Sequence, residues 1–446
     1  MHKLRKLLTV LAGCVFALPA ALTAAHAEEY SYTDENSPIY SSDYVYLIDI
    51  DTGQVLLDHN GEDRMYPASM TKIMPVIIAI ECIEEPDKTK IPITNSIVKG
   101  LYEAGATTAG FAIGDWPSVT DCLYGALLPS GADAVNALAV AVDGSIDAFV
   151  DHMNEYAGMI GMNHTHFTNA TGLHDPDHYT TAEDMAKLMT YALQNETFCE
   201  ILKAETYTTT SLYFHPAGIQ LKSTSWPMIN NGTGTYTIAG YLGGKTGFTN
   251  PAGRCLASHA EINGMHLVLI TGHAYTRGHI KDASQIYNWY DANYQRTDLL
   301  GSGRLLGTVD VIDTDPEFRY EIYTGDSIAR DLPKDAVITE EIEISDALYA
   351  PVEEGTFLAS YAVYADGQKL YEKQYYAETA AERNFRAYVI RMTLDFYHRH
   401  RILCFIMGAS LVLLVGLTAA LAIDHMNRVR RRKRKKKRRR KKTKTS

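Results

Sequence analysis

The chain has 446 residues, of which 46% are hydrophobic, so it can form more than one folded domain with a substantial core. Fifteen of its 42 Lys and Arg lie between positions 428 and 444, and three more lie near the N-terminus. Residues 28–427 therefore hold 24 bases against 53 acids, a net charge of about −29, which excludes a general polyanion-binding role for this region.

Residues 1–27 are typical of a cleaved export signal. Three bases precede an apolar stretch from position 7 to about 24, and Ala25-His26-Ala27 fits a small-x-small cleavage site. An uncleaved N-terminal anchor is the alternative, but acidic Glu28 and Glu29 follow the cleavage site at once.

The first segment with chemical potential follows an expected hairpin of strands at 44–50 and 54–57. Ser69 and Lys72 have the spacing that places two side chains on one face of a helix. Lys72 could then accept the proton of the Ser69 hydroxyl, provided that burial or a second cation lowers its pKa. S-x-x-K also occurs by chance as a helix cap followed by a solvated lysine. Pro75 lies inside this expected helix and predicts a kink just after Lys72.

Two later segments could complete a site. Ser130 lies in a Pro-Ser-Gly turn between two apolar helices, where an N-cap is the simpler interpretation. A strand is expected at 235–242, and Gly243-Gly244-Lys245-Thr246-Gly247-Phe248 follows it, with glycines that let a backbone approach a ligand closely.

The C-terminal third changes in character. Short alternating strands predict a small all-β domain at 303–380, followed by a helical stem at 381–401. Residues 402–423 carry no charge and are long enough to cross a bilayer as a helix. The basic tail at 424–446 then indicates the cytoplasmic side, so the main part of the chain lies outside. Lipid contact is a second interpretation of this tail, and nucleic-acid binding is disfavoured because the tail adjoins a span.

The exported cysteines are Cys82, Cys122, Cys199 and Cys255. All lie in or beside apolar stretches without close spacing, so buried free thiols are expected rather than disulfides. The histidines show no metal-ligand pattern, and neither a metal nor a cofactor is expected.

Taken together, Ser69-Met70-Thr71-Lys72, Ser130-Gly131-Ala132 and Lys245-Thr246-Gly247 resemble the S-x-x-K, S-x-x and K-T-G motifs of penicillin-recognising serine enzymes. The flanking residues, including Asn169-x-x-Gly-Leu and His178-Tyr-Thr-Thr-Ala-Glu-Asp-Met, are similar to those of serine-type D-alanyl-D-alanine carboxypeptidases, the low-molecular-mass penicillin-binding proteins.

The resemblance implies an α+β fold over residues 28–300, a β-lactamase/transpeptidase-like domain with an antiparallel sheet and a helical subdomain. It also implies that Ser69 attacks the peptide bond between two D-alanines, that Lys72 takes its proton and that Ser130 passes a proton to the departing D-alanine. Lys245 and Thr246 would bind the substrate carboxylate, with Gly247 and Phe248 completing the binding strand. The backbone N–H groups of Ser69 and Phe248 would form the oxyanion hole.

The partners implied are peptidoglycan stem peptides ending in D-Ala-D-Ala, and β-lactams as covalent inhibitors. One departure is Ala132, where relatives usually carry Asn. This substitution leaves open a catalytically impaired, membrane-tethered penicillin-binding sensor or scaffold. A serine β-lactamase is disfavoured because no E-x-x-x-N match lies between the second and third motifs.

Overall fold

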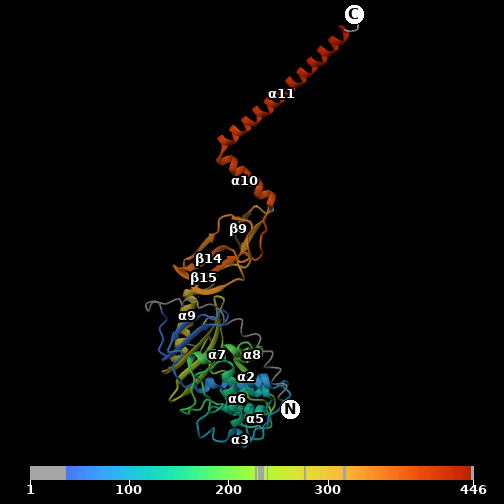
Figure 1. The fold of residues 1–446 in the computed structure, drawn as a ribbon. Helices are drawn as coiled ribbons and strands as arrows, with labels where there is room; N and C mark the ends of the chain where they lie inside the picture. Colours follow the sequence, from blue (N-terminus) through green and yellow to red (C-terminus); the bar gives the residue numbers. More distant parts are fainter. Residues whose placement is uncertain are drawn as a thin grey trace. The chain divides into compact units, whose positions relative to one another are not determined.

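The computed structural model describes residues 37–442, except for 227–228, 230–235, 239, 276–277 and 315–317, and the side chains of 436–442. The expected export signal at 1–27 lies outside the described residues. The chain forms two compact units (Figure 1). Among the described residues, the first unit comprises 37–302 together with 325–338 and 365–368, and the second comprises 303–324, 339–364 and 369–442.

A five-stranded antiparallel sheet organises the first unit, in the strand order β2-β1-β7-β6-β5. The expected hairpin is present as the first two strands. The strands are β1 (Tyr44–Asp49), β2 (Val55–His59), β5 (Tyr241–Thr249), β6 (Gly253–Ile262) and β7 (Met265–Ala274).

Alternating apolar residues give this sheet two buried faces. Leu267 and Leu269 point into a core shared with helix α9 (Gly278–Asn293), whereas Val268 and Ile270 belong to the core of the helical subdomain. Because successive side chains of a strand point to opposite faces, one apolar run serves both cores. The first unit is therefore a three-layer α+β structure, as the resemblance implied.

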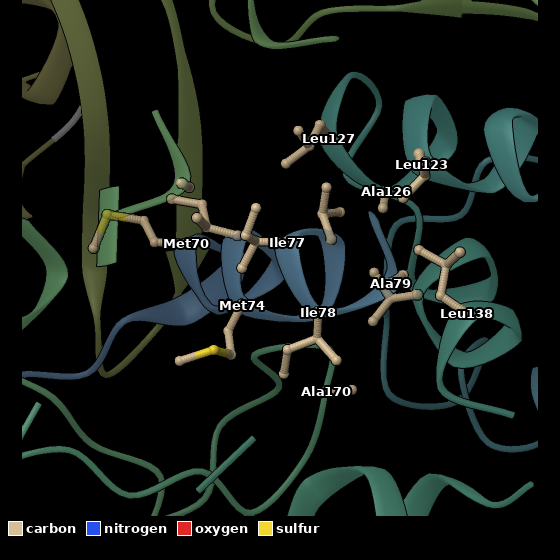
Figure 2. Close-up of a cluster of buried hydrophobic side chains, with 14 of the residues drawn as sticks. Met70, Met74, Ile77, Ile78, Ala79, Leu123, Ala126, Leu127, Leu138 and Ala170 are labelled. Atoms are coloured by element: carbon tan, nitrogen blue, oxygen red, sulfur yellow. The ribbon is translucent and has the colours of Figure 1, made fainter. Parts of the chain in front are cut away.

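The helical subdomain surrounds helix α2 (Ile73–Cys82), whose residues Ile73 to Ala79 are all buried. Figure 2 shows Met74, Ile77 and Ile78 of α2 among side chains from neighbouring helices and loops. The other helices of the subdomain are α3 (Asn95–Val98), α4 (Val119–Leu127), α5 (Ala132–Asp143), α6 (Ile146–Met159), α7 (Ala182–Ala192) and α8 (Glu196–Lys203). A short hairpin of β3 (Thr206–Thr208) and β4 (Gln220–Lys222) follows them.

Two local expectations need correction. Ser69 lies in a 3₁₀ segment, η2 (Ala68–Lys72), and α2 begins only at Ile73. Pro75 is thus in the first turn of α2, where the missing N–H would have no intrahelical partner, and the expected kink becomes a change from 3₁₀ to α geometry. The strand expected at 235–242 lies further along the chain. It is β5, which begins at Tyr241 and contains Lys245, Thr246 and Gly247.

The second unit contains two three-stranded sheets, β10-β9-β13 and β12-β14-β15, whose apolar residues form one shared core. Its strands are β9 (Leu305–Ile312), β10 (Arg319–Tyr323), β12 (Ile338–Ile344), β13 (Leu348–Tyr349), β14 (Phe357–Ala365) and β15 (Gln368–Tyr376). Two further strands, β11 (Ala329–Pro333) and β8 (Tyr294–Asp298), both belong to the first unit and pair with each other.

Two helices end the chain. Helix α10 (Phe385–Arg399) contacts the β domain through Arg391, whose guanidinium donates two hydrogen bonds to the Asp313 carboxylate at 2.8 and 2.7 Å. Helix α11 (Arg401–Lys442) contains a stretch of mean hydropathy 2.5 that is long and apolar enough to cross a membrane.

The cysteines only partly match expectation. All four are free thiols, and Cys122 and Cys255 are buried. Cys199, however, is half-buried and Cys82 is exposed at the end of α2, so the expectation of burial was wrong for these two. Apolar neighbours in sequence do not guarantee burial at the last turn of a helix.

Removing the side chain at the centre of α2 tests the importance of the helical core. Ile77→Ala should lower the free energy of unfolding by about 2–5 kcal/mol, because Ile77 is fully buried and its loss leaves a cavity. Chemical denaturation followed by circular dichroism measures this. Ile39 is 77% exposed, so Ile39→Ala should change stability by no more than about 0.5 kcal/mol. Equal effects of the two variants would contradict the assignment of Ile77 to the core.

Candidate active site

Ser69 and Lys72 form a hydrogen-bonded pair in the 3₁₀ segment. The Lys72 Nζ atom lies 2.8 Å from Ser69 Oγ. In a 3₁₀ helix, side chains three residues apart lie almost directly above each other, so this backbone brings the two groups together. Ser69 is partly exposed while Lys72 is buried, so a ligand can reach the hydroxyl but water has little access to the amine.

The buried Lys72 amine is a plausible proton acceptor on physical grounds. Burial lowers the pKa of Lys72 to about 7, against a weaker opposing effect of the Asp133 charge. Lys72 Nζ also donates a hydrogen bond to the backbone carbonyl of Thr171. Among the described residues, no hydrogen bond joins Ser69 or Lys72 to a carboxylate.

A second serine–lysine pair joins the other two motifs. Lys245 Nζ on β5 lies 2.9 Å from Ser130 Oγ and also donates to the Thr246 carbonyl at 2.8 Å. Ser130 has a φ of +67° and precedes Gly131, the N-cap of α5, so it is not the N-cap itself. Its unusual backbone conformation instead directs the hydroxyl toward the lysine.

Lys245 is fully buried, and burial together with the nearby Lys72 charge holds its pKa well below the usual range. The two pairs share one site, because Gly247, two residues after Lys245 on β5, packs directly against the backbone of Ser69. Beside Lys245, the half-buried Thr246 hydroxyl lies 2.7 Å from that of Thr224.

Asp133 stabilises the turn that carries Ser130. Its fully buried carboxylate accepts hydrogen bonds from the backbone N–H groups of Ala109, Gly110 and Phe111 at 2.7, 3.1 and 3.1 Å. The N–H of Ala132 donates in turn to the Thr107 carbonyl at 2.8 Å. The loop at 107–111 is therefore fixed against the second motif.

The residue before the nucleophile is held in a strained conformation. Ala68 has a φ of +46°, which costs free energy for a residue with a Cβ atom. Its carbonyl accepts the Thr71 hydroxyl at 2.7 Å, and Thr71 Oγ1 lies 2.8 Å from His178 Nε2. His178 Nδ1 accepts the N–H of Thr168, so the neutral ring carries its proton on Nε2 and donates to Thr71.

A loop organised by Asn169 closes this side of the site. The Asn169 Oδ1 atom accepts hydrogen bonds from the backbone N–H groups of Thr171 and Gly172 at 3.1 and 2.8 Å. Gly172 has a φ of +77°, and a Cβ atom there would lie 2.0 Å from the Ala68 carbonyl oxygen. Glycine is therefore required where this loop meets the strained residue.

Strand β5 also lies against the nucleophile. A Cβ atom on Gly247 would be 3.1 Å from the Ser69 backbone nitrogen, so the missing side chain lets the strand approach. Phe248 follows with 53% of its surface exposed and with the Arg254 guanidinium 4.8 Å from its ring centroid. This approach is consistent with an oxyanion hole formed by the N–H groups of Ser69 and Phe248.

The structure thus brings together every residue predicted for the site. Thr71, Asn169 and His178 lie within the sequence motifs that resemble the family. The motifs alone predict no role for these residues, because a sequence pattern does not reveal hydrogen-bond partners. Ala132 is buried and its methyl group offers no hydrogen bond, so the site lacks the amide that relatives usually have there.

Two serines, each paired with a desolvated amine beside a strained backbone turn, define a serine acyl-transfer enzyme. A family model described as D-alanyl-D-alanine carboxypeptidase matches residues 31–276, more than half of the chain. The chain belongs to the D-alanyl-D-alanine carboxypeptidase family.

Relatives extend this similarity beyond the family domain. The chain is 28% identical over 376 residues to the D-alanyl-D-alanine carboxypeptidase DacF of Bacillus subtilis, covering 83% of this chain and 92% of the relative. It is 34% identical over 183 residues to the carboxypeptidase DacC of Escherichia coli, covering 40% and 44%.

Solved structures share the fold. Penicillin-binding protein 5 of Haemophilus influenzae matches with a TM-score of 0.60 at 23% identity, covering 79% of this chain and all of that one. The DD-transpeptidase of Streptomyces K15 matches with a TM-score of 0.52 at 26% identity, covering 57% and 98%.

Protonation of His178 should be visible in the stability of the protein. Burial lowers the pKa of His178 from 6.5 to about 4, so between these values the unfolded chain binds a proton that the folded chain does not. The free energy of unfolding should therefore fall as the pH drops from 6.5 to 4, by about 3 kcal/mol from this residue.

Denaturation at a series of pH values measures this effect. His178→Gln should give a flatter pH dependence than the wild type, whereas the exposed His164→Gln should leave the wild-type slope unchanged. Identical slopes for His178→Gln and the wild type would show that folding does not lower the pKa of His178, which would contradict its burial as a neutral ring.

Proposed function

We propose that Ser69 is the nucleophile with which this D-alanyl-D-alanine carboxypeptidase removes the last D-alanine from peptidoglycan stem peptides. The observation that carries the proposal is the 2.8 Å contact between Ser69 Oγ and the desolvated Lys72 amine. A serine hydroxyl needs such a base beside it to attack a carbonyl at neutral pH.

In the acylation step, Ser69 Oγ attacks the carbonyl carbon between the two D-alanines and Lys72 Nζ takes the hydroxyl proton. The oxygen that becomes negative is stabilised by the N–H groups of Ser69 and Phe248. The C–N bond then breaks, and the departing amine receives a proton through the Ser130 hydroxyl, which Lys245 holds in place. Water attacks the resulting ester, releasing the shortened peptide and restoring Ser69.

Substrate recognition rests on the third motif. Lys245 and the half-buried Thr246 hydroxyl would bind the terminal carboxylate, whose negative charge favours the protonated Lys245 amine that burial disfavours in the free enzyme. Gly247 and Phe248 supply the adjoining strand edge. A β-lactam presents a reactive carbonyl and a carboxylate to the same groups, so we expect it to acylate Ser69 and inhibit the enzyme.

The second candidate is a penicillin-binding sensor or scaffold with impaired turnover, and the observation that favours it is Ala132. Acylation needs the two serine–lysine pairs, and both are complete. In this candidate function, release of the acyl group depends on the Asn amide that relatives usually carry at position 132. Labelling by penicillin without release of D-alanine would favour the sensor.

The apolar helix suggests that the enzyme is anchored in the cell membrane. We infer that it crosses the membrane once, with the catalytic domain outside and the basic tail in the cytoplasm, because Lys and Arg accumulate on the cytoplasmic side of spans. Along the chain, the β domain lies between the catalytic domain and the membrane-spanning helix.

Replacement of the nucleophile tests the central assignment. Ser69→Ala should abolish D-alanine release from a peptide ending in Lys-D-Ala-D-Ala and also abolish covalent labelling by a fluorescent penicillin. Ser96→Ala, at an exposed serine on α3, should retain both activities. Release or labelling that persists in Ser69→Ala would refute Ser69 as the nucleophile.

The pH dependence of acylation tests the role of Lys72. Because only the uncharged amine can accept a proton, the rate of penicillin acylation should rise with pH and reach half its maximum near pH 7. Stopped-flow fluorescence at pH 5.5–9 measures the profile. A rate that stays constant across this range would argue against Lys72 as the base.

A further inference from the structure

Four large apolar side chains lie exposed on two loops of the catalytic domain. Ile113, Trp116, Tyr213 and Phe214 are 52%, 56%, 78% and 55% exposed, and we call them the aromatic patch. Contiguous exposed apolar groups of this kind often mark interaction sites.

The patch is held rigidly by one buried carboxylate. Asp115 is fully buried and accepts hydrogen bonds from the backbone N–H groups of Ala112 and Phe214, both at 2.9 Å, and pairs with His215 Nδ1 at 3.2 Å. Phe214 and Tyr213 contact each other edge to face, with ring centroids 4.8 Å apart. The two loops are therefore cross-linked in one arrangement.

Each loop is connected to the active site at one of its ends. The first starts at Thr107, which accepts the N–H of Ala132, and continues through Phe111, whose N–H binds Asp133. The second returns to Thr224, whose hydroxyl contacts Thr246. From Phe111 to Trp116 is five residues, so the Cα atoms of these two residues are at most about 18 Å apart.

The charge around the patch limits the kind of partner. Residues 106–116 and 209–221 contain one acidic residue, the buried Asp115, and no Lys or Arg, although the exported region as a whole is strongly acidic. One cation from a neighbouring segment, Lys90, donates to the Thr210 hydroxyl at 3.1 Å. Exposed hydroxyl groups of Thr108 and Ser211 lie on the same two segments. Flat apolar rings with neighbouring hydroxyls suit an uncharged ligand that has apolar faces and hydroxyl edges.

We propose that the aromatic patch binds the sugar rings of the glycan strand to which the stem peptide is attached. An extended stem peptide of five residues spans roughly 17 Å, so a glycan strand linked to its far end lies well outside the catalytic groups, at the range of loop residues such as Trp116. The proposed function supplies the identity of the polymer, so the experiment measures glycan binding separately from catalysis.

The binding experiment uses the full-length chain in detergent micelles and a peptide-free tetrasaccharide of alternating N-acetylglucosamine and N-acetylmuramic acid. The lactyl carboxyl groups of this tetrasaccharide are capped as simple amides, so that it is uncharged at the positions where the stem peptide would be linked. The tetrasaccharide should bind wild type and also Ser69→Ala. The double variant Trp116→Ala/Phe214→Ala should bind at least tenfold more weakly, by calorimetry. Tyr323→Ala, which removes a 44% exposed aromatic side chain from the β domain, is the matched control and should bind normally.

Kinetics provide the second measurement. The double variant should release D-alanine from a free pentapeptide at a rate within twofold of wild type, but should have at least a fivefold higher KM for a glycan-linked pentapeptide. Equal tetrasaccharide binding by wild type and double variant would overturn the proposal, and so would an equal loss on both substrates. Inactive wild type that still binds the tetrasaccharide through the patch would refute the proposed function alone.

Discussion

Burial of two lysine amines beside two serine hydroxyls is the constraint on which the catalytic domain depends. Removing an ammonium group from water is costly, and the cost appears as the lowered pKa of Lys72 and Lys245. The protein offsets part of it with hydrogen bonds to Ser69, Ser130 and two backbone carbonyls. What remains is an amine that releases and accepts protons easily, which acyl transfer requires.

This arrangement needs a rigid frame, and the surrounding structure provides it. The Ala68 backbone is strained, so its geometry persists only because Thr71, His178 and the Asn169 loop fix it from two sides. Behind them lies helix α2, buried from Ile73 to Ala79, and β5 packs against Ser69 at Gly247. The large apolar core is thus what allows a few polar groups to remain dehydrated.

The sequence predicted the fold class and the hairpin at the start of the sheet, and the spacing of Ser69 and Lys72 predicted that these two side chains meet. Ser130 and Lys245 were identified through the family resemblance, since Ser130 alone looks like a helix cap. It did not predict the 3₁₀ segment, since Pro75 is compatible with either a kink or a first turn. It misplaced β5, because Gly243 and Gly244 look like a loop while tertiary pairing with β6 makes them a strand. The supporting role of His178 could not be predicted, since it depends on contacts across more than one hundred residues.

The close approach of Gly172 to the Ala68 carbonyl has an evolutionary consequence. Any side chain at position 172 would overlap that oxygen, and any relaxation of Ala68 would move the adjoining Ser69. Neither position can therefore drift alone without loss of activity. Across descendants of this gene, we expect the two sites to change together or not at all, so that substitutions accumulate on the β domain long before they reach this contact.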